Sequence, residues 1–381
     1  MKALVLLAGF AAAALGLGQA APTRSYVVVD TGQHRRFDDR GWIIEAGSTE
    51  FPGQDGDYDG PQPAYQDDGD GTVTDLQTGL IWQREPPEEL YTWQAAMAYA
   101  DALDLAGHDD WRLPNIKELL SIMDFAGSIR IHAPYVDTRY FGYHFPDVSG
   151  GHRDIDAQYW SSTPYVGRVM TGLEGAFGVN FADGRIKCYP TKFGPRGGPS
   201  GHYVRCVRGP EYGKNDFADN GDGTVTDRAT GLMWTKADSG VPMNWHDALH
   251  YAEALEFAGF SDWRLPNAKE LQSIVDYTRA PDAVDPARRP AAIDPLFDLT
   301  DQESWFWTST SHGDNTSHAI YIAFGRATSA WIWAGEKMNA HGAGAMRSDP
   351  KSGDPTWYAG GLGPQGDEIR IQNYVRCVRG G

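Results

Sequence analysis

The hydrophobic residues of this chain recur at helical spacing in two separate stretches. Apolar side chains repeat every three or four positions over residues 93–103 and again over residues 245–255, which predicts an amphipathic helix in each stretch. Thr92 and Asn244 stand directly before the two stretches, and both residue types are good N-caps. The pattern therefore predicts two equivalent helices far apart in the chain.

A second, shorter helix is predicted after each of these. Asn115 with Glu118, and Asn267 with Glu270, form an Asn-x-x-Glu variant of the capping box. Apolar residues at helical spacing follow both boxes, so each short helix should bury one stripe. We therefore interpret the two Glu residues as helix caps. We expect the arginines of the preceding Trp-Arg-Leu-Pro motifs to pair with carboxylates or to bind carbonyl groups.

Short runs bounded by glycine and other turn residues predict strands around these helices. The predicted strands are residues 178–186, 203–208, 319–327 and 374–379, and a hairpin is predicted at residues 72–82 and again at 224–234. Two helices followed by strands is an α+β pattern, with helices on one side of a small antiparallel sheet and long loops between the elements.

The whole series of elements occurs twice. The segment that starts at Trp93 returns at Trp245, and the turn that starts at Asp67 returns at Asp219, both at the same offset (245 − 93 = 219 − 67 = 152). A period this long indicates a duplicated domain rather than a solenoid repeat. We predict a lead-in segment over residues 21–66, a first domain over 67–210 and a second domain over 211–381.

The first twenty residues have the pattern of a secretory signal peptide. A basic start at Lys2 precedes an apolar run, and Gly18 and Ala20 provide small residues before a cleavage site. We expect cleavage near Ala20, and a secreted, periplasmic or cell-surface location. No apolar run of 18 or more residues follows, so no membrane span is expected in the mature chain.

The charge balance restricts the partners of the protein. Lys and Arg total 33 against 51 Asp and Glu, which gives a formal net charge of −18. A field of this sign repels phosphate backbones and anionic lipids, so no nucleic-acid partner is expected. Cations, neutral sugars and basic proteins remain compatible with it.

The repeated motifs resemble a known family. Both copies carry Gly-Asp-Gly-Thr-Val-Thr-Asp, Asp-Trp-Arg-Leu-Pro-Asn and Tyr-Val-Arg-Cys-Val-Arg, and the lead-in carries Asp30-Thr31-Gly32-Gln33 and Gly53-Gln54-Asp55. These motifs are similar to the Lcl C-terminal domain, also called the DUF1566 domain. The resemblance implies two tandem C-type-lectin-like domains, a fold related to formylglycine-generating enzymes, and a bacterial surface protein. A relative of this family is an adhesin domain that binds sulfated glycosaminoglycans, to which a charge of −18 is poorly matched.

The aspartate-rich turns are the candidate metal site. Carboxylates at this density could bind Ca²⁺, and the candidate ligands are Asp68, Asp70, Asp75, Asp219, Asp222 and Asp227. The calcium-loop pattern, however, would place Gln66 at its first position and Gln77 at its twelfth. An Asx turn that closes a hairpin explains the same residues, so we expect no cofactor. The tripeptides with which C-type lectins bind calcium and sugar together are also missing from the sequence.

A longer connection in the second copy, between residues 325 and 374, is the candidate ligand surface. C-type-lectin-like domains bind through such loops, and alternating tryptophans on a strand would share one face, as a sugar-stacking platform requires. The candidate residues are Trp305, Trp331, Trp333, His341, Arg347, Asp349 and Trp357. Two alternatives remain: the loop covers the domain junction, or the tryptophans pack against the other copy.

The three cysteines predict one disulfide. Cys188 and Cys206 both belong to the first copy, and an exported protein can retain a bridge between them. Cys377 is the repeat equivalent of Cys206 and is left over. It is either a small buried hydrophobe or a link to another chain.

These observations predict a secreted or cell-surface binding protein that recognises a carbohydrate or a surface protein without catalysis. One alternative is an enzyme related to the formylglycine-generating fold. Another is a structural assembly module, for which Cys377-linked oligomers would be the sign.

Overall fold

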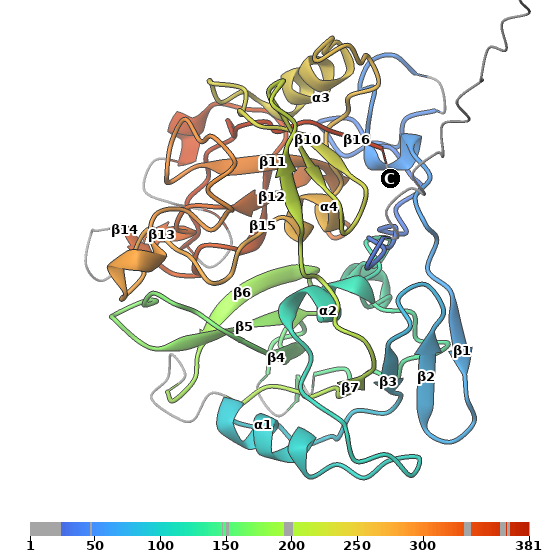
Figure 1. Ribbon diagram of the computed structural model, residues 1–381. Helices are drawn as coiled ribbons and strands as arrows, with labels where there is room; N and C mark the ends of the chain where they lie inside the picture. Colours follow the sequence, from blue (N-terminus) through green and yellow to red (C-terminus); the bar gives the residue numbers. More distant parts are fainter. Residues whose placement is uncertain are drawn as a thin grey trace, which may run out of the picture.

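The protein is built from two repeated halves and an N-terminal segment that contacts both (Figure 1). The computed structural model describes residues 24–45, 48–146, 148–149, 152–193, 201–330, 337–358, 363 and 366–380. We call residues 24–64 the N-terminal segment, residues 65–208 the first half and residues 217–379 the second half. The predicted signal peptide, Trp331 and Trp333 lie outside the described residues.

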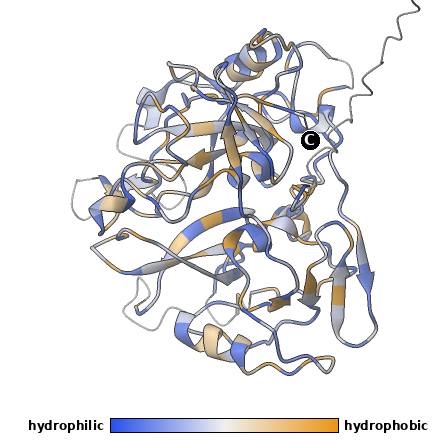
Figure 2. Cartoon of the chain, viewed as in Figure 1, coloured by the Kyte–Doolittle hydropathy of each residue, from blue (hydrophilic) through white to orange (hydrophobic). Residues whose placement is uncertain are grey.

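The first half contains two short helices and seven strands. The helices are α1 (Trp93–Asp101) and α2 (Ile116–Ser121). The strands are β1 (Tyr65–Asp67), β2 (Thr72–Asp75), β3 (Ile81–Gln83), β4 (Gln158–Pro164), β5 (Gly175–Asn180), β6 (Arg185–Pro190) and β7 (Val207–Arg208). Strands β1-β2-β3-β7 form one antiparallel sheet in that order, and β1 at its edge is mainly hydrophilic (Figure 2).

The second half repeats these elements and adds a hairpin. Its helices are α3 (Trp245–Glu253) and α4 (Ala268–Ser273). Its strands are β8 (Phe217–Asp219), β9 (Thr224–Asp227), β10 (Met233–Thr235), β11 (Trp305–Ser311), β12 (His318–Ala323), β13 (Thr328–Ala330), β14 (Lys337–Asn339), β15 (Met346–Pro350) and β16 (Val378–Arg379). Strands β16-β10-β9-β8 form its own antiparallel sheet. Single 3-10 turns occur at Asp55–Asp57, Ile129–Ile131, Pro286–Arg288 and Pro355–Tyr358.

The predicted helix starts are confirmed. The Thr92 hydroxyl accepts a hydrogen bond from the Ala95 amide in α1, and the Asn244 side chain accepts one from the Asp247 amide in α3. Both short helices begin with the predicted capping box. These caps satisfy amide groups that have no partner within a helix, which is why such short helices form.

The predicted arginine contacts are also confirmed, and they are the same in both halves. The Arg112 guanidinium donates two hydrogen bonds of 2.6 Å to the Glu118 carboxylate, and Arg264 does the same to Glu270. Each Glu carboxylate thus completes the capping box and also forms a bidentate ion pair with the arginine. The motif that contains these residues is structural in each copy.

The two halves share one continuous six-stranded sheet, in the order β4-β5-β6-β15-β12-β11. Each half contributes three antiparallel strands, and the halves meet where Ile186 of β6 pairs with Met346 of β15. Ile186 pairs with Val179 in the first half, as Met346 pairs with Ile322 in the second. Equivalent residues therefore pair with each other at the junction, as in a symmetric dimer. The sequence pattern predicts a separate small sheet for each copy, so it does not predict this shared sheet.

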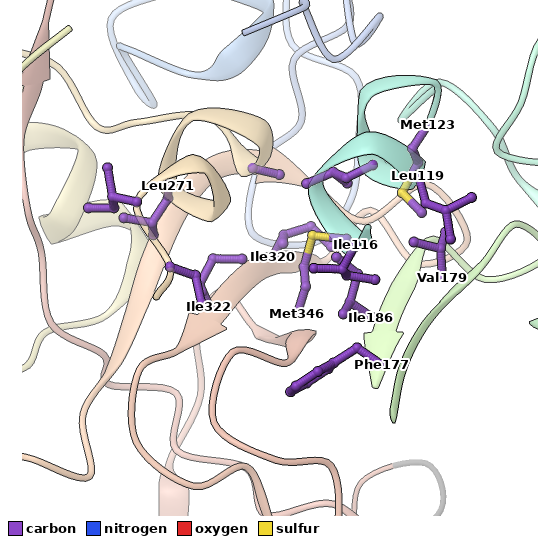
Figure 3. Close-up of a cluster of buried hydrophobic side chains, with 14 of the residues drawn as sticks. Ile116, Leu119, Met123, Phe177, Val179, Ile186, Leu271, Ile320, Ile322 and Met346 are labelled. Carbon is purple, nitrogen blue, oxygen red and sulfur yellow. The ribbon is translucent and has the colours of Figure 1, made fainter. Parts of the chain in front are cut away.

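Helices α2 and α4 cover one region of this shared sheet, and their side chains form the core between the halves (Figure 3). The side chains in this core come from both halves and are buried. They include Ile116, Leu119, Met123, Phe177, Val179, Ile186, Leu271, Ile320, Ile322 and Met346. Burying one such side chain contributes about 1.5–3 kcal/mol, so this core is a major stabilising contact of the fold.

Two lysines, Lys269 buried and Lys117 partly exposed, cross the junction in equivalent ways. Lys117 of α2 donates a hydrogen bond of 2.7 Å to the Ser273 carbonyl, and Lys269 of α4 donates one of 2.9 Å to the Ser121 carbonyl. All four positions match at the repeat offset (269 − 117 = 273 − 121 = 152). Burial lowers the pKa of both lysines to about 8. Carbonyl groups of the opposite half accept hydrogen bonds from the two ammonium groups, which compensates for the loss of water around them.

The long connection of the second copy proves to contain strands. Residues 181–184 join β5 to β6 directly, whereas residues 324–345 join β12 to β15 and include the β13–β14 hairpin. Strand β15 takes the place of β6, inside the shared sheet. The part of the connection that forms β15 therefore packs at the junction of the halves. This agrees with the alternative that the connection covers the domain junction.

The N-terminal segment is tied mainly to the second half. The Gln33 side-chain amide donates to the Ser311 carbonyl and accepts from the Ser311 amide, both at 2.8 Å. The Thr316 hydroxyl donates to the Gly41 carbonyl at 2.8 Å. The Phe125 amide of the first half donates to the Thr31 carbonyl at 2.8 Å. The segment thus bridges the two halves before it enters β1.

The predicted disulfide between Cys188 and Cys206 is wrong. All three cysteines are free and buried. Cys188 lies in the core between the halves, and Cys206 lies in a separate cluster with Trp111 and Trp160. Burial raises the pKa of the Cys206 and Cys377 thiols to about 12. Within the described ranges, no helix is long and apolar enough to cross a membrane.

We predict that the protein unfolds in one transition because its halves share a sheet and a core. Ile186→Ala should destabilise the whole protein by about 2–5 kcal/mol, since it opens a cavity at the junction. Ile131→Ala is the control, because Ile131 is 72% exposed. Urea unfolding followed by circular dichroism and by tryptophan fluorescence would measure both. Two separate transitions, with only one shifted by Ile186→Ala, would contradict the shared core.

A second prediction concerns the thiols. Denatured protein should react with a thiol reagent at three positions per chain without prior reduction. Dithiothreitol should leave the melting temperature unchanged, because there is no bond for it to break. Two fewer reactive thiols, restored by reduction, would show that a disulfide forms after all.

Candidate functional site

A cavity of about 410 Å³ lies between the N-terminal segment and the second half, beside the start of α4. We call it the α4 cavity. Its lining is mixed polar and apolar, and it brings together the N-terminal segment and several separate parts of the second half. The polar residues that line it include Arg24, Asp30, Asp55, Tyr58, Asp59, Thr230, Arg264, Asn267, Glu270 and Ser309. The cavity therefore offers carboxylates, two guanidinium groups, an amide, hydroxyls and one aromatic ring.

The second half supplies one wall through the cap of α4. The Arg264–Glu270 ion pair holds both side chains in fixed positions, and the Asn267 side-chain oxygen accepts from the Glu270 amide at 2.9 Å. The Asn267 side-chain NH₂ group has no acceptor among the described residues. This wall thus presents a hydrogen-bond donor that no residue in the described ranges uses.

The N-terminal segment supplies the opposite wall, and Asp55 is its most unusual residue. Its carboxylate accepts hydrogen bonds from the hydroxyls of Thr31 (2.8 Å) and Thr310 (2.6 Å) and is 3% exposed. Burial raises the pKa of Asp55 to about 7. Near neutral pH this carboxyl is therefore protonated in a large fraction of molecules, and it can then act as a hydrogen-bond donor.

Tyr58 provides the aromatic surface of the cavity. Its ring lies 5.2 Å from the Arg264 guanidinium carbon, and its hydroxyl donates to the Glu253 carboxylate of α3. The residue is 39% exposed. The ring is thus held from two sides and still partly accessible.

The first half has an equivalent cavity, but the linker between the halves enters it. The Asn115 side-chain NH₂ group, which corresponds to that of Asn267, donates to the Tyr212 carbonyl at 3.1 Å. Lys117 donates to the Gly213 carbonyl at 3.1 Å. The remaining space of about 340 Å³ is lined by residues of both halves. The linker therefore uses the Asn115 amide, whose equivalent on Asn267 stays available in the second half, whereas Lys269 donates to the Asp30 and Ser121 carbonyls.

Most of the ligand-binding residues predicted from the sequence lie inside the protein. Trp305 is fully buried, stacks on Tyr321 at 4.5 Å between ring centroids, and has the Arg370 guanidinium carbon 3.7 Å from its own ring centroid. Arg347 and Asp349 belong to β15 and are buried in the second half. These side chains contact other parts of the protein, so the structure offers no open face at them.

His341, Arg347 and Asp367 form one buried cluster. His341 Nε2 lies 2.6 Å from one Asp367 carboxylate oxygen, and Arg347 pairs with the other oxygen. Burial lowers the pKa of His341 well below its usual range, and it raises the pKa of Asp349 to about 6. The structure thus brings together two of the predicted residues, His341 and Arg347, but in an internal charge network around Asp367. Trp357 differs from them, because it is 70% exposed.

The aspartates proposed as metal ligands are hydrogen-bonded within their turns. Asp70 accepts from the Thr72 amide and hydroxyl, and Asp222 accepts from Thr224 in the same way. The other four candidates, Asp68, Asp75, Asp219 and Asp227, also accept hydrogen bonds from nearby turn residues. In the described part of the chain, no three His, Cys, Asp or Glu side chains gather as a metal site would require.

Comparison with known families identifies the two halves. Residues 71–208 and residues 223–343 each match the Lcl C-terminal domain. The chain belongs to the Lcl C-terminal domain family. Searches of curated proteins and of solved structures gave no match. Membership in this family indicates a surface or adhesin-like protein. The second match ends at residue 343, whereas the second half continues through β15 and β16 to Arg379.

The α4 cavity was missed from the sequence, although a signal for it was present. The lead-in motifs that resemble the Lcl C-terminal family contain Asp30, Thr31 and Asp55, and of these Asp30 and Asp55 contact the second half. The resemblance marked these residues without showing where they fold. Their contacts with residues about 240 or more positions away cannot be predicted from local patterns.

The raised pKa of Asp55 predicts a pH-dependent stability. The folded protein keeps a proton that the unfolded chain releases above pH 3.8, so the Asp55 contribution to the free energy of unfolding falls as pH rises from about 4 to 7. Asp55→Asn keeps an acceptor for the threonines and removes this titration. The stability of Asp55→Asn relative to the natural protein should therefore rise over that range, by roughly 4 kcal/mol at most.

Urea unfolding at a series of pH values would measure this difference. Asp59→Asn, on the exposed side of the same cavity, is the control and should change the pH profile little. A difference between Asp55→Asn and the natural protein that stays constant from pH 4 to 7 would contradict the raised pKa.

Proposed function

We propose that this protein is a secreted or cell-surface binding protein that holds a carbohydrate in the α4 cavity without catalysis. Within this proposal, each half has the C-type-lectin-like fold. The observation that carries the proposal is the cavity itself, in which donors and acceptors stand beside an aromatic ring. Binding sites commonly combine a concave surface with a few precisely placed polar groups.

The chemistry of the lining favours a neutral sugar. Sugar hydroxyls both donate and accept hydrogen bonds, and the cavity has free donors at Asn267 and acceptors at Asp30 and Asp59. The Tyr58 ring offers an apolar face of the kind that packs against a sugar ring. The net charge of −18 disfavours a sulfated polymer, because the protein repels polyanions at long range.

The alternatives have less support. A carboxyl whose pKa is near 7 is also a feature of general acids. Among the other carboxylates of the cavity, Glu270 is the best placed for a catalytic role, but its ion pair with Arg264 and its contacts in the helix cap hold it in place. The three thiols are buried and have raised pKa values, which argues against the cysteine chemistry of formylglycine-generating enzymes. Burial of Cys377 likewise argues against assembly through an intermolecular disulfide.

A glycan array would test the proposal directly. The mature chain from Ala21 should bind neutral glycans, with or without calcium. Tyr58→Ala should weaken this binding about tenfold or more, equivalent to about 1.4 kcal/mol, because it removes the aromatic face of the cavity. Circular dichroism and a melting curve would establish that the variant is folded.

Trp357→Ala is the matched control, because Trp357 is an exposed aromatic residue outside the cavity. We expect it to bind glycans like the natural protein. Loss of binding in Trp357→Ala but not in Tyr58→Ala would move the site to the surface around Trp357. An array without any binding would remove carbohydrate as the ligand.

A further inference from the structure

Two exposed histidines lie one turn apart on α3. His246 and His250 are separated by four residues on this nine-residue helix, so they project from the same face. Their ring centroids are 4.5 Å apart, with an angle of 56° between the ring planes. Neither ring is buried. Two histidines at this spacing on one helix face are a recurrent arrangement for binding a metal ion.

The His246 ring is held in a defined orientation by its neighbours. Its Nδ1 atom lies 3.3 Å from an Asp247 carboxylate oxygen, and the other oxygen of Asp247 accepts from the Asn244 side chain at 2.9 Å. Phe51 of the N-terminal segment packs edge-on against the same ring, with centroids 5.0 Å apart. A carboxylate at one ring nitrogen fixes the tautomer and leaves the other nitrogen free as a ligand.

We propose that His246 and His250 bind a divalent late transition-metal ion, of the class of Ni²⁺, Cu²⁺ and Zn²⁺. Metal–nitrogen bonds of about 2 Å place the ring centroids of two imidazoles on one ion roughly 4.5–5 Å apart, as the two rings are here. Imidazole nitrogens suit these ions, whereas Ca²⁺ and Mg²⁺ prefer oxygen ligands. The Asp247 carboxylate is the outer partner that orients the His246 ring.

The surroundings of the pair favour a cation. Glu253 follows His246 and His250 on the same face of α3, where its carboxylate accepts a hydrogen bond from Tyr58. The protein as a whole carries a net charge of −18. No third protein ligand stands at the pair within the described residues, so water completes the coordination and the ion exchanges with solvent. The site is separate from the α4 cavity and does not depend on the proposed function.

The duplication provides an internal control for this site. At the repeat offset, His246 corresponds to Gln94 of α1 and His250 corresponds to Ala98 (246 − 94 = 250 − 98 = 152). Helix α1 has the same length and the same type of N-terminal cap as α3. His246→Gln and His250→Ala therefore replace each ligand with a residue that this helix already accommodates in the other half.

Isothermal titration of the untagged full chain with Ni²⁺ tests the proposal. We expect one ion per chain, and a loss of affinity of about tenfold or more in either single variant, because each removes one of two ligands. His108→Gln, which removes an exposed histidine of the first half, is the control and should bind Ni²⁺ normally. Circular dichroism would show that all three variants are folded.

Three results would overturn the proposal. The natural protein could bind no Ni²⁺, the two α3 variants could bind as tightly as the natural protein, or His108→Gln could lose as much affinity as they do. An equal loss of affinity in His108→Gln would mean that surface histidines in different parts of the chain bind the ion.

Discussion

The pairing of Ile186 with Met346 is the contact on which the arrangement of the molecule depends. Each residue occupies the same position in its own half, and the two meet on adjacent antiparallel strands. A sheet edge left open would expose unpaired backbone groups and invite aggregation. Here the two edges meet at the Ile186–Met346 pair, where each half covers part of the edge of the other. The duplicated halves thus associate as two subunits of a symmetric dimer would, within one chain.

The lysine contacts follow from the same geometry. Because Lys117 and Lys269 sit at equivalent positions beside the junction, each reaches a carbonyl group of the opposite half. A buried ammonium group is costly unless its hydrogen bonds are satisfied, so these lysines favour this arrangement of the halves over others. Apolar packing supplies the attraction, and the lysines restrict the geometry.

Local features of the fold could be predicted from the sequence, and long-range features could not. Caps at Thr92 and Asn115 and the hairpins depend on neighbours a few residues away, so their patterns were sufficient. The placement of β15 depends on β6, more than 150 positions earlier, and no local pattern shows it. The disulfide was predicted from proximity in sequence, but Cys188 and Cys206 belong to different cores.

Besides the β13–β14 hairpin, the two halves differ in what covers the start of their short helices. In the first half carbonyl groups of the linker accept hydrogen bonds from the side chains of Asn115 and Lys117. In the second half the N-terminal segment stands there, and it leaves the α4 cavity with Asp55 and Asn267 in its walls. A duplicated structural core thus carries one site that is not duplicated, which is why residues common to both copies did not reveal it.

Hydrogen exchange, followed residue by residue in the intact chain, tests the central claim most directly. The Cys188 amide of β6 donates to the His341 carbonyl of the second half at 2.8 Å. If the halves form one body, this amide and those of β15 exchange as slowly as the amides of β5 and β12, through global unfolding. If β6 and β15 are independent edges, their amides exchange orders of magnitude faster, and the account of a shared sheet is wrong.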